Sequence, residues 1–552
     1  KAIGIDIGGT ITKIGVVSED GICSHKISFR TKEYSKFNDY IDNLNDKINS
    51  IQSKFKNIVG IGIGAPNASK NGKPVIPLYI FEPDYWQQTF SSLRQWSFIF
   101  DSLVELREEC RNLGQTLIVR RGAAASVFEE LAHEFPIGAI HAHEETGNGW
   151  SRARDESVRD WCAYHSVDFS EYPSNGIIRG LANRDDWARL RGARMLMPTV
   201  PSPSNLIGLP DISPGDIPSK SAPISRGTAA ALTQNGGRNS GQTALRMFLQ
   251  TNAKKYLRHI SEPNLSQKYC SRLSSHLTWG TMSVREVVKA IQSRSLALKN
   301  MGDNSWARNL RAFESRLAWR CHFIQKLEDQ PEIEDRCMHS AFESLREPDS
   351  NEEHYDAWKL GMTGYPLVDA CMRSLNHGGW ITFRMRAMLV SFASYNLWID
   401  WRRSGSHLAQ VFTDYEPGIH YSQLQMQSGV TSINAIRIYN PLKQSFENDP
   451  AGDFIRRWIP ELRGIPAPWV HNPWKMSRAL QSRYGCQLAK DYPKPLVDHE
   501  VTARLAKKRI KSASLGDDFR AESIRVFDKL GSRRRAKIPK ARHDKNQLTL
   551  SF

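Results

Sequence analysis

The stretch from Thr363 to Asn376, TGYPLVDACMRSLN, carries the strongest structural signal in the sequence. Pro366 suits the first turn of a helix, because proline has no N–H to donate and its φ is already helical. The apolar residues that follow recur at the spacing of one helical face: Leu367, Val368, Cys371, Met372 and Leu375. The stretch therefore predicts a helix that begins at Pro366 and packs against a core.

A pair of hydroxyls lies upstream, in the stretch 269–280, YCSRLSSHLTWG. Ser271 and Ser274 are three residues apart near an expected helix start, where hydroxyls and free backbone amides can bind phosphate oxygens. The same pattern is common, and it often serves only as a helix cap. Taken alone, the segment leaves both interpretations open.

Charged residues gather downstream of the predicted helix. The tripeptide GGW at 378–380 precedes a second predicted helix, with Arg384 and Arg386 at its start. The loop TDYEPGIH that comes later contains Asp414 and Glu416, two carboxylates two residues apart. The helical region therefore combines arginines with carboxylates, a combination that suits a polar site.

The first third of the chain has a different pattern, in which strand and helix signals alternate. The predicted strands are 74–83, 116–119 and 137–141, and the predicted helices between them are 98–113 and 123–131. Alternation at this interval predicts a parallel α/β sheet. We expect an α/β domain over 68–200, a Pro/Ser/Gly-rich linker over 201–240, a helical domain over 241–510 and a basic tail over 511–552.

These segments together resemble the DNA photolyase/cryptochrome family. The motifs occur in the family's order: LYIFEP at 78–83, TGYPLVDACMRSLN, GGW, IDWR at 399–402, RIYNP at 437–441, FIRRWIPEL at 454–462 and VHNPW at 470–474. The resemblance implies an α/β domain followed by an all-helical domain that binds FAD. It further implies blue-light-driven repair of pyrimidine dimers in DNA by electron transfer from reduced flavin. A cryptochrome-like photoreceptor that binds FAD without repair is the alternative.

The resemblance also assigns roles to individual residues. Those expected to contact FAD are Tyr256, Ser271, Leu273, Ser274, Arg386, Asp414 and Glu416. Arg386 would pair with Asp414 beside the flavin, because a buried arginine needs a carboxylate; a simple core ion pair is the alternative. Those expected to contact DNA are Arg316, Trp319, Arg320 and Arg384, and the catalytic set is Trp319, Arg386 and Trp401. Trp319 would stack on a flipped-out base, with core packing as the alternative.

Three residues depart from the family's pattern around the expected lesion pocket. Arg316 stands where many relatives have Glu or Gln, and a guanidinium can donate hydrogen bonds but cannot accept them. Phe383 replaces a polar residue near the flavin, and Ala387 replaces a bulky one. These departures leave the type of lesion open.

The expected electron relay also differs from the family's. Trp401 matches its middle tryptophan, but the position next to the flavin falls among residues 422–424, Ser-Gln-Leu. Tyr421 or Trp398 could take the place of the missing tryptophan. Repair does not require this relay if the flavin is already reduced.

The N-terminus belongs to neither part of this pattern. Residues 2–17 predict two strands joined by a glycine turn, and they resemble the start of a ROK-type sugar kinase over residues 1–67. No later kinase motif follows, so kinase activity is not expected. Since the family's opening strand is missing, we hypothesise that Ile58–Gly64 supplies the first strand of the α/β sheet. Binding of a second, antenna chromophore stays open.

Composition is consistent with a nucleic-acid-binding protein. The 75 Lys and Arg residues outnumber the 58 Asp and Glu residues, and a net charge of +17 attracts polyanions, although basic tails alone could account for it. The last residues, 547–552 (QLTLSF), resemble a peptide that docks on the bacterial sliding clamp.

The eight scattered cysteines predict reduced thiols in a cytoplasmic protein without a metal site, with an iron–sulfur cluster as the alternative. No stretch is long and apolar enough to predict a membrane span or a signal peptide, and we expect a monomer.

Overall fold

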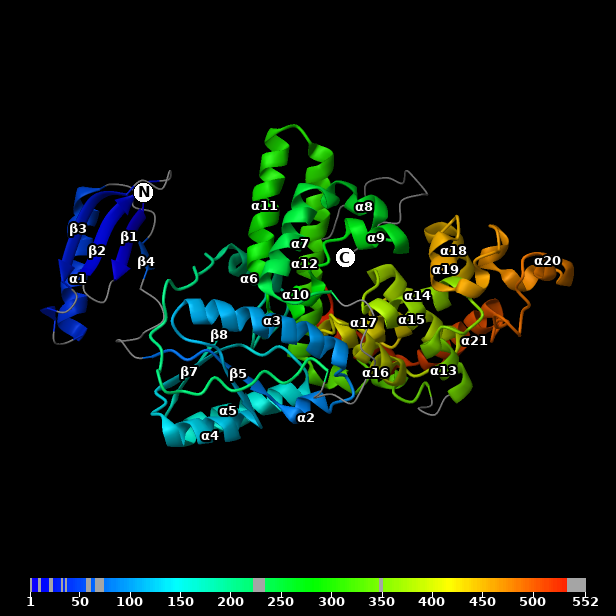
Figure 1. The fold of residues 1–552 in the computed structure, drawn as a ribbon, viewed down its shortest axis with the longest axis horizontal. Coiled ribbons are helices and arrows are strands. Elements are labelled where there is room, and N and C mark those ends of the chain that lie inside the picture. The colour runs from blue at the N-terminus through cyan, green and yellow to red at the C-terminus, as the bar shows by residue number, and fades with distance from the viewer. Residues whose placement is uncertain are drawn as a thin grey trace. The chain divides into compact units, whose positions relative to one another are not determined.

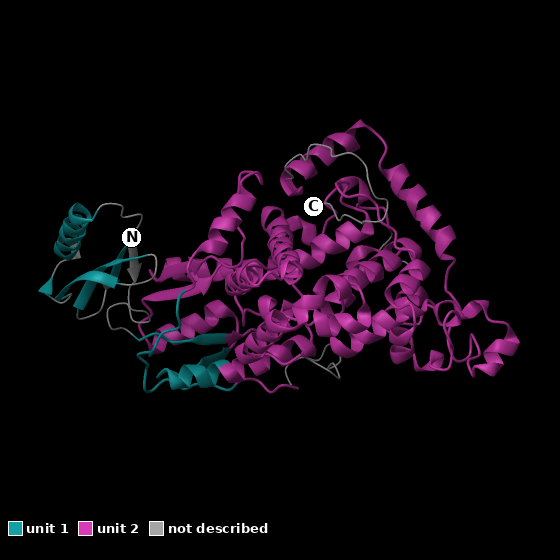
Figure 2. Cartoon of the chain, turned by 90° about the horizontal axis from the view of Figure 1, so that it is seen from above, with its two compact units in different colours: residues 1–79, 106–120, 200–216 teal, residues 80–105, 121–199, 217–552 magenta. Residues whose placement is uncertain are grey.

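The computed structural model describes residues 2–7, 11–18, 23–30, 33–34, 37–55, 61–64, 74–221, 234–346 and 351–533. The chain divides into two compact units (Figure 2). One unit comprises residues 1–79, 106–120 and 200–216, and the other comprises residues 80–105, 121–199 and 217–552.

A small sheet opens the first unit (blue in Figure 1). Strands β1 (Ala2–Ile7) and β2 (Ile11–Val17) pair antiparallel, as the sequence predicted. Strand β3 (Cys23–Arg30) extends the sheet beyond β2, and α1 (Phe37–Lys54) packs against it. The alternating apolar residues of the strands form a core with one face of the helix: Ile3, Ile5, Ile14, Val16, Tyr40, Leu44 and Ile51.

Strand β4 (Ile61–Gly64) corrects one expectation. It pairs in parallel with β1, and its backbone aligns Ile61 with Ile3 and Ile63 with Ile5. The hypothesis that this stretch supplies the first strand of the photolyase-like α/β sheet is therefore wrong. The strand completes the order β3-β2-β1-β4 instead, because its backbone hydrogen bonds are satisfied by β1.

The α/β segment has the predicted alternation of strands and helices. Its elements are β5 (Leu78–Phe81), α2 (Pro83–Trp86), α3 (Leu93–Asn112), β6 (Ile118–Arg121), α4 (Ala124–Glu134), β7 (Ala139–His143), α5 (Gly149–Tyr164), β8 (Asp168–Tyr172) and α6 (Trp187–Leu196). The described strands of this segment form two two-stranded sheets. One pairs β5 with β6, and the other pairs β7 with β8 in parallel. Helices α4 and α5 bury Ala124, Val158 and Trp161 beside β7 and β8.

Helices make up the rest of the second unit (Figure 1). They are α7 (Arg238–Gln250), α8 (Tyr256–His259), α9 (Pro263–Tyr269), α10 (Ser274–Thr278), α11 (Val284–Asn300), α12 (Asn304–Asp329), α13 (Glu352–Leu360), α14 (Pro366–Gly378), α15 (Phe383–Ser391), α16 (Trp401–Val411), α17 (Pro417–Ser428), α18 (Pro441–Asn448), α19 (Asp453–Trp458), α20 (Arg478–Arg483), α21 (His499–Ala513) and α22 (Asp517–Leu530). Short 3₁₀ helices lie at Pro331–Glu334 and Ser340–Phe342, among others.

Helix α14 begins at Pro366, as predicted, and its apolar face is buried. The turn before it is held by Asp369, which accepts hydrogen bonds from Thr363 Oγ1 (2.6 Å), Gly364 N (3.0 Å) and the Tyr492 hydroxyl (2.5 Å). Burial raises the pKa of Asp369, and the hydrogen bonds from Thr363 and Tyr492 counteract part of the increase. The polar residues of the TGYP motif therefore stabilise the turn that starts the helix.

Helical structure continues past residue 510. Helix α22 buries Val526 and Leu530 in a cluster with Leu327, Ile333 and Met338. The expected clamp-docking peptide at 547–552 lies outside the described residues, and so does most of the basic cluster before it.

Two further expectations concern the cysteines and the possibility of a membrane-spanning helix. None of the eight cysteines forms a disulfide in the structure, and their reduced state stays a prediction. Within the described parts of the chain, no helix has both the length and the apolar character needed to cross a membrane.

Candidate functional site

An ion pair between Arg386 and Asp414 lies at the centre of the candidate site. Arg386 is in the first turn of α15, and Asp414 is in the loop between α16 and α17. Arg386 Nη2 donates to Asp414 Oδ2 over 2.9 Å, and the side chains are 23% and 4% exposed. Burial alone would raise the pKa of Asp414, but Arg386 lowers it below its usual value. The predicted ion pair is present.

Glu416, two residues further on, has a different partner. It binds Arg320 of α12, whose Nη2 also donates to the backbone oxygen of Leu277 over 3.1 Å. Both side chains are buried, and burial raises the pKa of Glu416 although Arg320 opposes the increase. The loop is therefore tied to α15 by one carboxylate and to α12 by the other.

This second pair affects the role expected of Arg320. The sequence assigned Arg320 to DNA phosphates, and that assignment stays a prediction. Burial of the guanidinium against Glu416 does not favour it, because an arginine that binds phosphates must reach the surface.

Arg272 is a third arginine of the site, and it was not predicted from the sequence. It lies between Ser271 and Ser274 with φ of 58°, and its guanidinium stacks on Trp380 with 4.0 Å to the ring centroid. Burial lowers the pKa of Arg272 to about 10, and Asp414 partly offsets this. Within the described residues, no carboxylate lies within 4.0 Å of this guanidinium. One feature of the sequence could have identified Arg272, because it is a cation that lies between two serines predicted to bind phosphate.

Residues expected in the lesion pocket lie on α12 and α15. Arg316 and Trp319 are both half-buried on α12, and the guanidinium lies 4.1 Å from the centroid of the indole ring. On α15, Phe383 is 43% exposed, whereas Ala387 is buried. Arg384 donates to Ser261 Oγ over 2.8 Å.

The remaining predicted cofactor contacts lie at the start of the helical region. Tyr256 is buried, where its ring meets those of Phe248 and Phe313 edge-on, and burial raises the pKa of its hydroxyl. Leu273 is buried directly before α10, and Ser274 is the first residue of that helix. The Ser274 hydroxyl lies close enough to Asp414 to lower the pKa of the carboxyl.

The polar groups of this site fit a ligand that both donates and accepts hydrogen bonds. Ser274 Oγ, Asp414 Oδ1 and Arg320 Nε are buried; Ser274 lies close to the Asp414 carboxyl without a hydrogen bond of good geometry, and Arg320 Nε makes no hydrogen bond within the described residues. Buried polar groups are normally paired, so such atoms point to a partner outside the chain. Together with the Arg272 guanidinium, they suit the imide and diphosphate groups of FAD.

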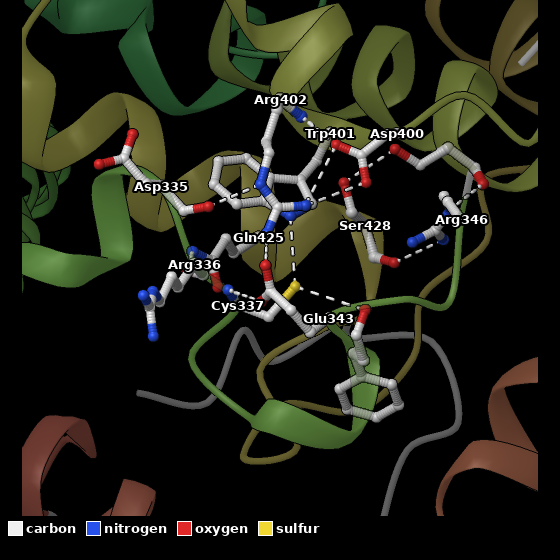
Figure 3. Close-up of polar contacts among 12 residues, drawn as sticks. Asp335, Arg336, Cys337, Glu343, Arg346, Asp400, Trp401, Arg402, Gln425 and Ser428 are labelled. Carbon is white, nitrogen blue, oxygen red and sulfur yellow. Dashed lines mark hydrogen bonds and ion pairs between the residues drawn. The ribbon is translucent and has the colours of Figure 1, made fainter. Parts of the chain in front are cut away.

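Trp401, the expected relay residue, is buried at the start of α16. Its indole Nε1 donates to Cys337 Sγ over 3.4 Å (Figure 3). Gly405 lies on α16 with Trp401, and Leu424 of α17 packs against it. A side chain at position 405 would collide with Leu424. Of the two proposed substitutes, Tyr421 accepts a hydrogen bond from Tyr415 (3.1 Å), and Trp398 packs against the guanidinium of Arg346.

Comparisons with known proteins show which family models and which relatives the chain resembles. Two family models match: DNA photolyase over residues 65–179, and the FAD binding domain of DNA photolyase over residues 313–512. The chain is 29% identical over 457 residues to a cryptochrome DASH of Gloeobacter violaceus, covering 78% of this chain and 88% of that protein. It is 28% identical over 468 residues to a deoxyribodipyrimidine photo-lyase of Streptomyces griseus, covering 80% and 94%.

The fold also matches that of solved structures. A class III photolyase of Agrobacterium tumefaciens superimposes with a TM-score of 0.71 at 23% identity, over 81% of this chain and 93% of that one. A Synechocystis cryptochrome matches with the same TM-score at 22% identity, over 80% and 94%. The motifs, the two family models and the architecture agree, and over most of its length the chain belongs to the DNA photolyase/cryptochrome family, with an FAD-binding domain.

Proposed function

We propose that the protein is an FAD-dependent DNA photolyase that repairs pyrimidine dimers in blue light. The observation that carries this proposal is the Arg316–Trp319 pair on α12, a half-buried aromatic ring under a cation. Trp319 directly precedes Arg320, which binds the Glu416 carboxylate of the expected flavin site. A flipped-out base stacked on Trp319 would therefore lie close to the cofactor, as electron transfer requires.

The chain's own residues would hold the cofactor and tune its charge. Arg272 and the hydroxyls of Ser271 and Ser274 would bind the phosphates, and the Arg386–Asp414 pair would lie beside the flavin ring. When bound, reduced and excited by blue light, FAD would supply the one-electron chemistry that splitting of a dimer requires. The protein contributes binding, orientation and exclusion of water.

Other residues would hold the DNA. Trp319 would stack on the extruded dimer, and Arg316 would donate hydrogen bonds to carbonyl or phosphate oxygens of the lesion. Arg384, anchored by Ser261, would bind a backbone phosphate. Duplex binding would weaken with salt, because each phosphate contact releases counterions.

A cryptochrome-like photoreceptor is the second candidate function. It is supported by the relatives named cryptochrome DASH, which are as similar to the chain as those named photo-lyases. It is also supported by the altered pocket residues Arg316, Phe383 and Ala387. The kinase-like interpretation of residues 1–67 stays a prediction, and the family models begin at residue 65.

Repair of a dimer-containing oligonucleotide by the chemically reduced protein, in blue light and in the dark, tests the proposal. We expect light-dependent repair that is lost in W319A and retained in R311A, a control that removes an exposed arginine from the same helix. Bound FAD, measured by its absorbance, should be unchanged in W319A and reduced in R272M. An intact flavoprotein that repairs nothing in light would favour the photoreceptor.

A further inference from the structure

Cys337 and Trp401 form a buried pair that the proposed repair reaction does not use (Figure 3). The Trp401 side chain is 1% exposed, and Cys337 is 7% exposed. The indole Nε1–H donates to Cys337 Sγ over 3.4 Å. Since an indole can only donate through this group, the thiol serves as the acceptor that a buried tryptophan requires.

The thiol is neutral and has a defined orientation. Burial raises the pKa of Cys337 to about 11, and the hydrogen bond from Trp401 lowers it only in part. The sulfur also lies 3.5 Å from the backbone oxygen of Phe342, to which the S–H donates. The two side chains therefore form a short chain of hydrogen bonds from indole to thiol to carbonyl.

One guanidinium and two carboxylates lie around the pair. The Arg402 guanidinium lies 4.7 Å from the centroid of the Trp401 ring, and it is paired with Asp400 (3.2 Å) and with Glu343. Glu343 also accepts the backbone N–H of Cys337 over 2.8 Å, and its side chain is 46% exposed. A carboxylate that reaches solvent thus lies beside the cysteine.

Cys337 is also the redox-active neighbour of Trp401. Within the described residues, no aromatic ring stacks on or meets the edge of the Trp401 ring. The oxidisable atom in direct contact with the indole is the sulfur of Cys337.

We infer that Cys337 is an electron donor to Trp401 when light oxidises this tryptophan, an inference that rests on the proposed flavin photochemistry. Photoexcited, oxidised FAD is the oxidant, and it removes one electron from Trp401. The sulfur of Cys337 then transfers one electron to the oxidised indole, and the S–H bond breaks. Its proton is released to solvent. The products are neutral Trp401, a thiyl radical at Cys337, one proton, and one electron retained on the cofactor.

This step would keep the electron on the flavin. Oxidised Trp401 would recover its electron from the reduced cofactor by back transfer unless another donor reduced it first. The hydrogen bond between the two side chains gives the thiol direct contact with the indole nitrogen. The chain would thereby stabilise reduced FAD without a tryptophan at residues 422–424.

Time-resolved absorption and electron paramagnetic resonance of the full-length protein carrying oxidised FAD test the inference. We expect a Trp401 radical that decays about tenfold more slowly in C337A than in the wild type, a change of about 1.4 kcal/mol in barrier. C337S should behave like C337A, because a hydroxyl accepts the indole hydrogen bond but does not supply an electron. C486A, which removes another buried thiol, should behave like the wild type.

The variants distinguish failure of electron donation by Cys337 from failure of the relay role of Trp401. Wild-type decay in C337A, or rescue of the wild-type decay by C337S, would overturn electron donation by the thiol. Wild-type photoreduction in W401F would overturn this inference and the relay role of Trp401 together. Neither result affects the dimer-repair assay, which starts from reduced FAD.

Discussion

Replacing Arg386 by methionine leaves the Asp414 carboxylate buried without its ion-pair partner. The Asp414 side chain is only 4% exposed, so solvent cannot compensate for the loss. Breaking a buried ion pair in this way costs about 3–5 kcal/mol. Arg272 still acts on Asp414 in the variant, so we expect the lower limit, about 3 kcal/mol. For a domain of this size, that corresponds to a decrease in Tm of about 6 °C.

The pH dependence of this decrease follows from the sign of the pKa shift. In the wild type the pKa of Asp414 lies below its unfolded value of 3.8, so the pair stabilises the fold above that value. This stability is lost as the pH falls through the folded pKa. In R386M, burial remains without the main opposing charge and raises the pKa of Asp414. Acid then protonates the buried carboxyl, and the difference between variant and wild type should shrink toward pH 4.

Calorimetry of the flavin-free proteins between pH 7 and pH 4.5 measures both effects. D414N and the double variant complete a double-mutant cycle, and we expect a coupling of at least about 1.5 kcal/mol. A Tm difference under about 2 °C at pH 7 would refute the reasoning, and so would one that does not change with pH.

Three further predictions concern other residues. Y492F removes a donor from the buried Asp369 carboxylate and should lower the free energy of unfolding by about 1.5–3 kcal/mol in urea; an unchanged midpoint would contradict the role of this hydrogen bond. Burial lowers the pKa of His407 to about 4, so as the pH falls this imidazole is protonated in the unfolded chain before it is protonated in the folded protein. The stability of the wild type should therefore fall as the pH drops from 6.5 toward 4. In H407N the loss of Tm between pH 7 and pH 5 should be smaller, and an equal loss would count against a neutral, buried His407. R384A should lower the salt slope of duplex binding by about 1 in a fluorescence titration, whereas a slope matching that of R311A would argue against a phosphate contact.

Local patterns in the sequence were sufficient for much of the fold. The proline and the apolar spacing after it located the start of α14, because helix starts and buried faces depend on residues a few positions apart. The two strands at residues 2–17 were predicted for the same reason. Ordered motifs indicated the family, and with it the pairing of Arg386 with Asp414, 28 residues away.

Contacts between distant segments were decided only by the tertiary structure. Strands β4 and β1 pair residues that are 58 positions apart. Glu416 and Arg320 are 96 positions apart, and Cys337 and Trp401 are 64 positions apart. The local sequence of Glu416 or Arg320 gives no sign of the other, because this ion pair depends on how packing brings a loop and a distant helix together. The sequence by itself determined which residues could form helices, strands and charged sites. Packing of those elements determined which arginine neutralises which carboxylate, and which thiol lies against the buried tryptophan.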